Sequence, residues 1–118
     1  MRTQGAAFEQ MAKEYLQRNK LKHICENFNC KVGEVDLIMQ QGNTLVFVEV
    51  KQRANKHFGG ALAAVTHKKQ QRIIKSAMFY CQKEKINFEQ QACRFDVVAI
   101  TGDKPPYEIQ WVKNAFPN

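Results

Sequence analysis

The sequence contains no continuous apolar run of the length that a signal peptide or a membrane-spanning helix requires. This absence, with a polar N-terminal segment of helical pattern, predicts a cytoplasmic protein that does not associate with membranes. The four cysteines form no CxxC pair and have no regular metal-ligand spacing, so a zinc site is not expected and the thiols should be reduced. The three histidines likewise form no HxxH or HExxH pattern, and the chain has neither repeats nor a low-complexity tract.

Acidic residues are also scarce. The 118 residues include 11 Asp and Glu against 18 Lys and Arg, which gives a formal charge of +7. Such a balance favours polyanionic partners, with nucleic acid as the first candidate, although a merely soluble charged surface explains it as well. The length and a hydrophobic content of 44% predict a single domain spanning residues 1–118.

Apolar periodicity and turn residues predict both helices and strands. The expected elements are a helix over 4–18 capped by Thr3, a weak edge strand over 21–30, strands over 33–40 and 44–52, a helix from the N-cap Thr66 to about 85, and strands over 94–101 and 107–112. Residues 53–60 are expected to form a loop, and 61–65 a short turn of helix. A helix between the third and fourth strands implies a right-handed crossover between parallel strands, and therefore an α/β fold with a central mixed sheet.

The long helix is expected to bury one face and expose the other. Its apolar face is predicted to consist of Ile74, Ala77, Met78 and Cys81.

The two central strands predict a hairpin whose register decides which residues meet. A tight turn at Gly42-Asn43 places Gln41 opposite Thr44. Counting back from the turn, Asp36 faces Glu49 and Glu34 faces Lys51, while Val35 points to the other face. Three carboxylates and one ammonium are therefore predicted to gather at the open end of an otherwise apolar hairpin.

Such a cluster needs compensation, because ions removed from water are costly unless they are paired or liganded. Asp36 and Glu49 can supply oxygen ligands to Mg²⁺ or Mn²⁺, and these cations complete their coordination with water and a substrate phosphate. Lys51 could then stabilise developing negative charge or orient the attacking water. The alternative is a set of ordinary salt bridges at a solvated end of the sheet.

An acid on one strand followed by Glu49-Val50-Lys51 on the next resembles the PD-(D/E)xK motif of the restriction-endonuclease-like nucleases, although Val35 stands where that motif has proline. More narrowly, the chain resembles the bacterial YraN-like family, itself similar to archaeal Holliday junction resolvases. That resemblance is carried by Gly5–Glu9, Gly33-Glu-Val-Asp-Leu-Ile, Phe47–Arg53, Phe58-Gly59 and Arg94-Phe-Asp-Val-Val. It implies a restriction-endonuclease-like fold in which Asp36 and Glu49 bind metal, Lys51 assists catalysis and Glu9 reaches the same site.

Other polar and aromatic residues leave alternatives open. Contact with nucleic-acid phosphates is predicted, against the alternative of a solvated surface, for Arg53, Lys56, Lys68, Arg72 and Lys75. Arg94 and Asp96 are expected to pair with each other. Tyr107, Trp111 and Phe116 could stack on bases, but packing against the core is favoured.

These expectations combine into a metal-dependent DNA endonuclease, with branched or structured DNA as a candidate substrate. The alternatives are a non-catalytic nucleic-acid-binding module with the same fold, or a structural adaptor for another protein. The resemblance to junction-cutting enzymes also implies a homodimer.

Overall fold

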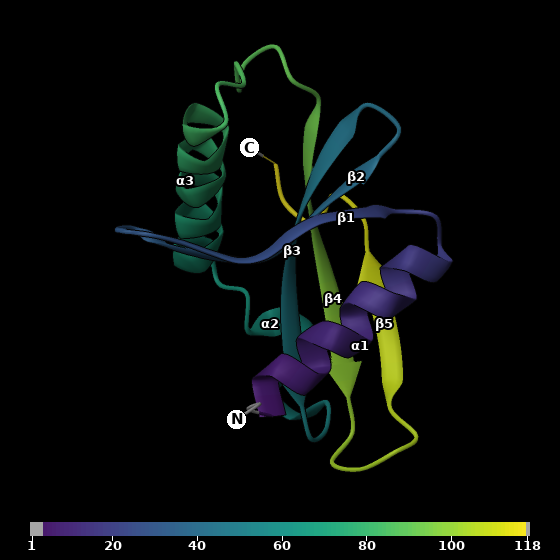
Figure 1. Cartoon of the computed structure of the whole chain (residues 1–118). Helices are drawn as coiled ribbons and strands as arrows, with labels where there is room; N and C mark the ends of the chain where they lie inside the picture. The colour runs from purple at the N-terminus through teal and green to yellow at the C-terminus, as the bar shows by residue number, and fades with distance from the viewer. Residues whose placement is uncertain (1–3, 118) are drawn as a thin grey trace.

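A five-stranded mixed sheet forms the centre of the protein, and a computed structural model describes it for residues 4–117. The elements in chain order are α1 (Gln4–Arg18), β1 (Lys22–Cys30), β2 (Gly33–Gln41), β3 (Thr44–Arg53), the 3-10 helix η1 (His57–Gly59), α2 (Gly60–Ala63), α3 (His67–Lys83), β4 (Cys93–Thr101) and β5 (Glu108–Val112). The strands lie in the order β1-β2-β3-β4-β5, and only the β3–β4 pair among them is parallel. Figure 1 shows α1 across one face of the sheet and α3 along the other.

This architecture confirms the predicted fold class, an α/β fold with a mixed sheet flanked by helices, and it is compatible with a restriction-endonuclease-like fold. The predicted helices and strands all form, with ends that differ by at most a few residues. Thr66 caps α3 as predicted, because its side chain accepts a hydrogen bond from the Lys69 amide at 3.3 Å. The predicted cap at Thr3 lies outside the described residues.

Two hydrophobic clusters hold the helices on the sheet. Beneath α1, Phe8, Ala12 and Leu16 pack against the side chains of β2, β3 and β4 that point to this face. Beneath α3, aromatic rings dominate, with Phe47 and Phe95 stacked 5.5 Å apart in the middle. Burying both faces of β3 and β4 explains why these strands are nearly continuous apolar runs.

The buried face of α3 includes the predicted Ala77 and Cys81, and Ile74 packs against it, but the prediction is wrong for Met78. Met78 is 49% exposed, whereas Ile73 and Tyr80 are buried beside Ala77 and Cys81. Ile73 and Ile74 are adjacent, so the sequence offers two apolar stripes one residue apart, and the helix buries the stripe that contains Ile73. Ser76 also lies on the buried face, where its hydroxyl donates to the Arg72 carbonyl at 2.8 Å.

The predicted hairpin register is correct from the turn to Leu37, which pairs with Val48, and then it breaks. Gly42 has a φ of 58°, as the first central residue of a type II′ turn requires. Beyond Leu37 no ladder joins β2 to β3, so the predicted pairs of Asp36 with Glu49 and of Glu34 with Lys51 are absent. Val35 lies in the cluster under α3, not on the predicted face. In β1, the residue opposite Asp36 is Asn27, which has a φ of 54°. Both β1 and β2 are therefore irregular where β2 leaves β3.

Several smaller expectations are also decided. All four cysteines are free, as predicted, with Cys81 buried and the others half-buried. No helix within residues 4–117 combines the length and the apolar character needed to cross a membrane.

Candidate active site

Asp36 lies where β2 separates from β3. Its carboxylate takes the place of a backbone acceptor that the missing strand pairing would have supplied. The Val50 amide of β3 donates to Asp36 Oδ2 at 2.8 Å, a hydrogen bond that a paired strand would otherwise accept. The side chain is only 7% exposed. Asp36 is therefore held rigidly against the edge of β3, and the sequence places a charge at the point where the two strands part.

Glu49 points to the same place from β3. It is 9% exposed, its side chain hydrogen-bonds with that of Asp36, and Lys51 Nζ lies 3.4 Å from Glu49 Oε2. Burial raises the pKa of Glu49 from 4.5 to about 9, with further increases from the hydrogen bond to Asp36 and from its charge. The Lys51 ammonium lowers the pKa of Glu49, but by less than burial and Asp36 raise it. At neutral pH Glu49 therefore keeps its proton.

Glu9 reaches the same region from the second turn of α1. Its pKa rises from 4.5 to about 7, first because of burial and then because of the negative charges of Asp36 and Glu34. A hydrogen bond with the side chain of Asn27 acts in the opposite direction. The structure therefore brings together the four residues predicted to be catalytic, although by a strand divergence and not by the cross-strand pairing that was expected.

The donor set of this cluster suits a hard divalent cation. Two neighbouring carboxylates repel each other when both are ionised, and a divalent cation relieves that repulsion. No group of three or more His, Cys, Asp or Glu side chains within the described residues is arranged to hold a metal. The candidate ligands are therefore the pair Asp36 and Glu49, which matches the one or two carboxylates that usually hold Mg²⁺ beside substrate phosphates.

The five residues predicted to contact nucleic acid are all placed at or near the surface. Lys56 pairs with Glu108 at 3.0 Å, and the Arg53 guanidinium donates to the Gln52 carbonyl at 2.6 Å. Both therefore have partners within the chain. Lys68, Arg72 and Lys75 are exposed on α3, and Arg72 and Lys75 line a polar cleft beside the turn between β1 and β2.

Sequence reasoning missed two residues near this site. Asn27, which hydrogen-bonds with Glu9, is a polar residue in a weak strand and gave no signal of its own. Lys31, in the turn between β1 and β2, lines the same cleft as Arg72 and Lys75. A lysine in a short turn is ordinary, so only the folded chain shows that it faces a helix with two further cations.

The remaining predicted contacts favour a structural role. Arg94 Nε donates to Asp96 at 3.0 Å, as expected for the pair. Trp111 Nε1 also donates to Asp96, at 2.9 Å, and Phe116 is buried. Tyr107 packs edge-on against Phe8. These three aromatic residues support the core, as favoured, and Asp96 lies on a different strand from the acidic cluster.

Comparison with known proteins identifies the family of this chain. A family model described as "Uncharacterised protein family UPF0102" matches residues 8–100, a range that includes Glu9, Asp36, Glu49 and Lys51. The chain belongs to the UPF0102 family. A UPF0102 protein of Aeromonas hydrophila is 47% identical over 114 residues, which cover 97% of this chain and 85% of that protein.

Two further relatives extend the comparison. A UPF0102 protein of Photobacterium profundum is 46% identical over 98% of this chain and 90% of its own length. One of Legionella pneumophila is 46% identical over 95% of this chain and 92% of its own. These names carry no activity, so the function of the UPF0102 chain has to be argued from the site itself.

Proposed function

We propose that this protein is an endonuclease that depends on Mg²⁺ or Mn²⁺ and hydrolyses phosphodiester bonds of DNA, with branched or structured DNA as the preferred substrate. The observation that carries the proposal is the buried Asp36–Glu49 pair with the Lys51 ammonium beside it. A buried pair of acids is costly, and the one ammonium beside it, that of Lys51, does not cancel the rise in the pKa of Glu49. A role in binding a cation explains why such a pair is present.

Each residue of the cluster has a role that follows from its contacts. Asp36 and Glu49 would hold the cation, and the Val50 amide keeps Asp36 in a fixed orientation. When bound, the cation supplies Lewis-acid polarisation of the scissile phosphate and lowers the pKa of the attacking water. Lys51 places a positive charge beside the phosphate, where negative charge develops.

Glu9 is suited to proton transfer. A carboxyl group with a pKa of about 7 is present in both protonation states near neutral pH, which is the condition for an effective general acid or base. Its approach from α1, on a different element from the other three residues, leaves it free to act on a proton without also holding the cation. Its expected role is therefore to accept or deliver a proton during hydrolysis.

The charge of the whole protein supports a nucleic-acid substrate. A formal charge of +7 attracts polyanions and raises their local concentration near the protein. Lys68, Arg72 and Lys75 on α3 make no ion pair within residues 4–117, so they are available for phosphates. The two-fold dimer implied by the resemblance to junction-cutting enzymes stays a prediction.

The experiment is a cleavage assay with purified protein, Mg²⁺ or Mn²⁺, and a panel of duplex, single-stranded and four-way-junction DNA. We expect cleavage of at least one substrate, with a loss of roughly 100-fold or more in Glu49→Gln and Lys51→Met. Glu89→Gln is the matched control, because Glu89 is an exposed carboxylate in the segment after α3. It should cleave as the wild type does.

The opposite results are equally clear. Wild-type protein that cuts none of these substrates with either cation contradicts the proposal. Binding to DNA that persists in Glu49→Gln and ignores divalent cations would instead favour the non-catalytic module. Cleavage retained in both Glu49→Gln and Lys51→Met would contradict the assignment of the site to this cluster.

A further inference from the structure

A polar cleft lies between the turn that joins β1 to β2 and the first half of α3. Its volume is about 830 Å³, and its walls include Lys31, Gly33 and Glu34 from the turn and from β2, and Arg72 and Lys75 from α3. Figure 1 shows the β1–β2 hairpin extending past α3, away from the other strands. Cations therefore reach this cleft from two separate elements.

These three cations have no carboxylate partner among the described residues. The ion pairs of residues 4–117 involve Lys13, His23, Lys51, Lys56 and Arg94, but neither Lys31 nor Arg72 nor Lys75. The Lys31 ammonium lies over the Phe79 ring, whose centre is 5.7 Å from its Nζ. The one acid in the cleft wall, Glu34, is exposed and leaves an excess of positive charge.

The cleft is built on a close contact between the turn and the helix. Cys30 Sγ lies 3.5 Å from Ser76 Oγ, and Ser76 in turn donates to the Arg72 carbonyl. A side chain at Gly33 would bring its Cβ to 3.3 Å from Ser76 Oγ, so the backbone approaches α3 more closely than most residues permit. The spacing between Lys31 and the helix is therefore fixed before any ligand binds, which lowers the cost of binding.

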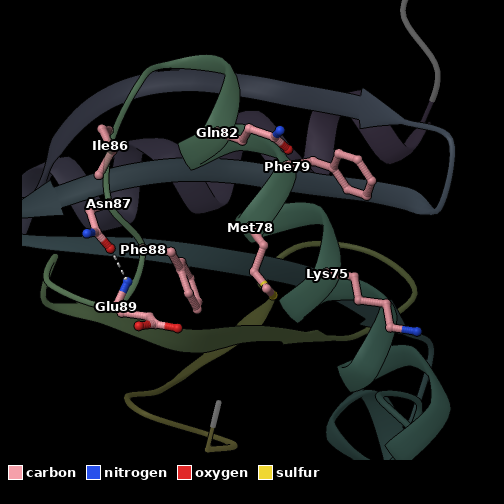
Figure 2. A pocket seen from close by; sticks show the side chains of 8 residues that line it. All are labelled: Lys75, Met78, Phe79, Gln82, Ile86, Asn87, Phe88 and Glu89. Carbon is pink, nitrogen blue, oxygen red and sulfur yellow. Dashed lines mark hydrogen bonds between the residues drawn. The ribbon is translucent and has the colours of Figure 1, made fainter.

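A second hollow on the other side of Lys75 has a different character. It measures about 640 Å³ and is lined mainly by apolar side chains, among them Met78, Phe79, Ile86 and Phe88. In Figure 2 the ammonium of Lys75 points away from Phe88 and Glu89. The Lys75 charge therefore does not serve the apolar hollow.

We propose that the polar cleft binds the phosphodiester backbone of a nucleic acid, held between Lys31 on one side and Arg72 and Lys75 on the other. This inference rests on the proposed function and names where the substrate lies beyond the site of cleavage. Gly33 begins the strand that carries Asp36, and three residues of strand span about 10 Å. One nucleic-acid molecule can therefore occupy the cleft and the acidic cluster together.

The test measures binding of a labelled duplex DNA by fluorescence anisotropy in EDTA, where no cleavage occurs, at salt concentrations from about 50 to 200 mM. Lys31→Gln combined with Arg72→Gln removes one cation from each side of the cleft. We expect weaker binding at low salt and a decrease of about 2 in the slope of log affinity against log salt, because each lost phosphate contact lowers it by about 1.

The matched control removes two positive charges elsewhere. Lys22 and Lys83 are exposed at the far ends of β1 and α3, outside the cleft, so Lys22→Gln with Lys83→Gln changes the net charge equally. It should keep nearly all of the wild-type slope. Equal losses in the two double variants would show that net charge alone drives binding, and would overturn the proposal.

Other outcomes separate this proposal from the proposed function. Cleavage by the wild type together with an unchanged slope in the cleft variant would refute the cleft and leave the nuclease intact. A reduced slope in a protein that cuts no DNA would support the cleft alone. Wild-type protein that does not bind the duplex overturns the cleft proposal. If the double variant melts at a lower temperature than the wild type, Lys75→Gln provides the same test with an expected decrease of about 1.

Discussion

Replacing Glu49 by glutamine should change how the stability of the protein depends on pH. Burial raises the pKa of Glu49 to about 9 in the folded chain, whereas the ordinary value is 4.5. Between these values the folded state binds a proton that the unfolded state has lost. The free energy of unfolding of the wild type must therefore fall as pH rises through this range.

The size of the effect follows from the width of the range. Between the two pKa values, each rise of one pH unit lowers the free energy of unfolding of the wild type by at most about 1.4 kcal/mol. From pH 5.5 to 8 the wild type should lose up to about 3 kcal/mol relative to Glu49→Gln, a difference of roughly 10 °C in melting temperature. The neutral amide keeps the size of the side chain and has no charge to bury, so Glu49→Gln should be the more stable protein at pH 8.

Comparing the two proteins removes the contributions of other groups. Burial lowers the pKa of His23, which makes stability increase with pH below about pH 6.5, and burial raises the pKa of Cys93 to about 11. Both groups are present in both proteins, so the difference between the curves isolates Glu49. Urea unfolding in EDTA at several pH values gives the two curves. Curves that run parallel from pH 5.5 to 8 would refute the raised pKa of Glu49.

Two further predictions test the structural core. Asp96 is fully buried and accepts hydrogen bonds from Arg94, Trp111 and the Asn114 amide, so Asp96→Ala should lower the free energy of unfolding by about 3–5 kcal/mol, because the Arg94 charge loses its partner. Breaking the exposed pair of Lys56 and Glu108 with Glu108→Ala should cost less than about 1 kcal/mol, and equal losses in urea unfolding would contradict this. On α3, Ile73→Ala should cost about 2–5 kcal/mol and Met78→Ala less than about 0.5 kcal/mol, since only the first side chain is buried. A larger loss in Met78→Ala than in Ile73→Ala would instead place Met78 on the buried face, as the sequence predicted.

Much of the fold could be predicted because local rules and the hydrophobic pattern agree. The Gly42 turn and strands that are apolar on both faces determine the hairpin register as far as Leu37. On α3 the prediction failed at Met78, because two adjacent isoleucines fit the period equally well and because Ser76, a polar residue, was not expected to be buried. Its hydroxyl is satisfied within its own helix, which is a contact that composition does not reveal.

The residues of the candidate site could be predicted, but their arrangement could not. Val35, Asp36 and Leu37 alternate as a regular strand does, so nothing in the pattern indicates that β2 leaves β3 there. Two features accompany the separation: the Asp36 side chain accepts from the Val50 amide, and Asn27 in the neighbouring strand has a left-handed backbone. Both are consequences of three-dimensional packing, and neither has a signature in the local sequence.

Asp36 therefore has two tasks, and two substitutions separate them. In Asp36→Asn the amide oxygen can still accept from Val50, and the repulsion with Glu49 disappears, so stability in EDTA should stay within about 1 kcal/mol of the wild type. In Asp36→Ala the buried Val50 amide has no acceptor, which should cost about 1–3 kcal/mol. If Asp36 and Glu49 bind Mg²⁺ as proposed, the cation should raise the melting temperature of the wild type at pH 8 but not that of either variant, because binding needs the Asp36 carboxylate. If Asp36→Asn is as unstable as Asp36→Ala, the negative charge of Asp36 is itself needed to hold β3 in place. The carboxylate would then have a structural role that does not depend on binding a cation.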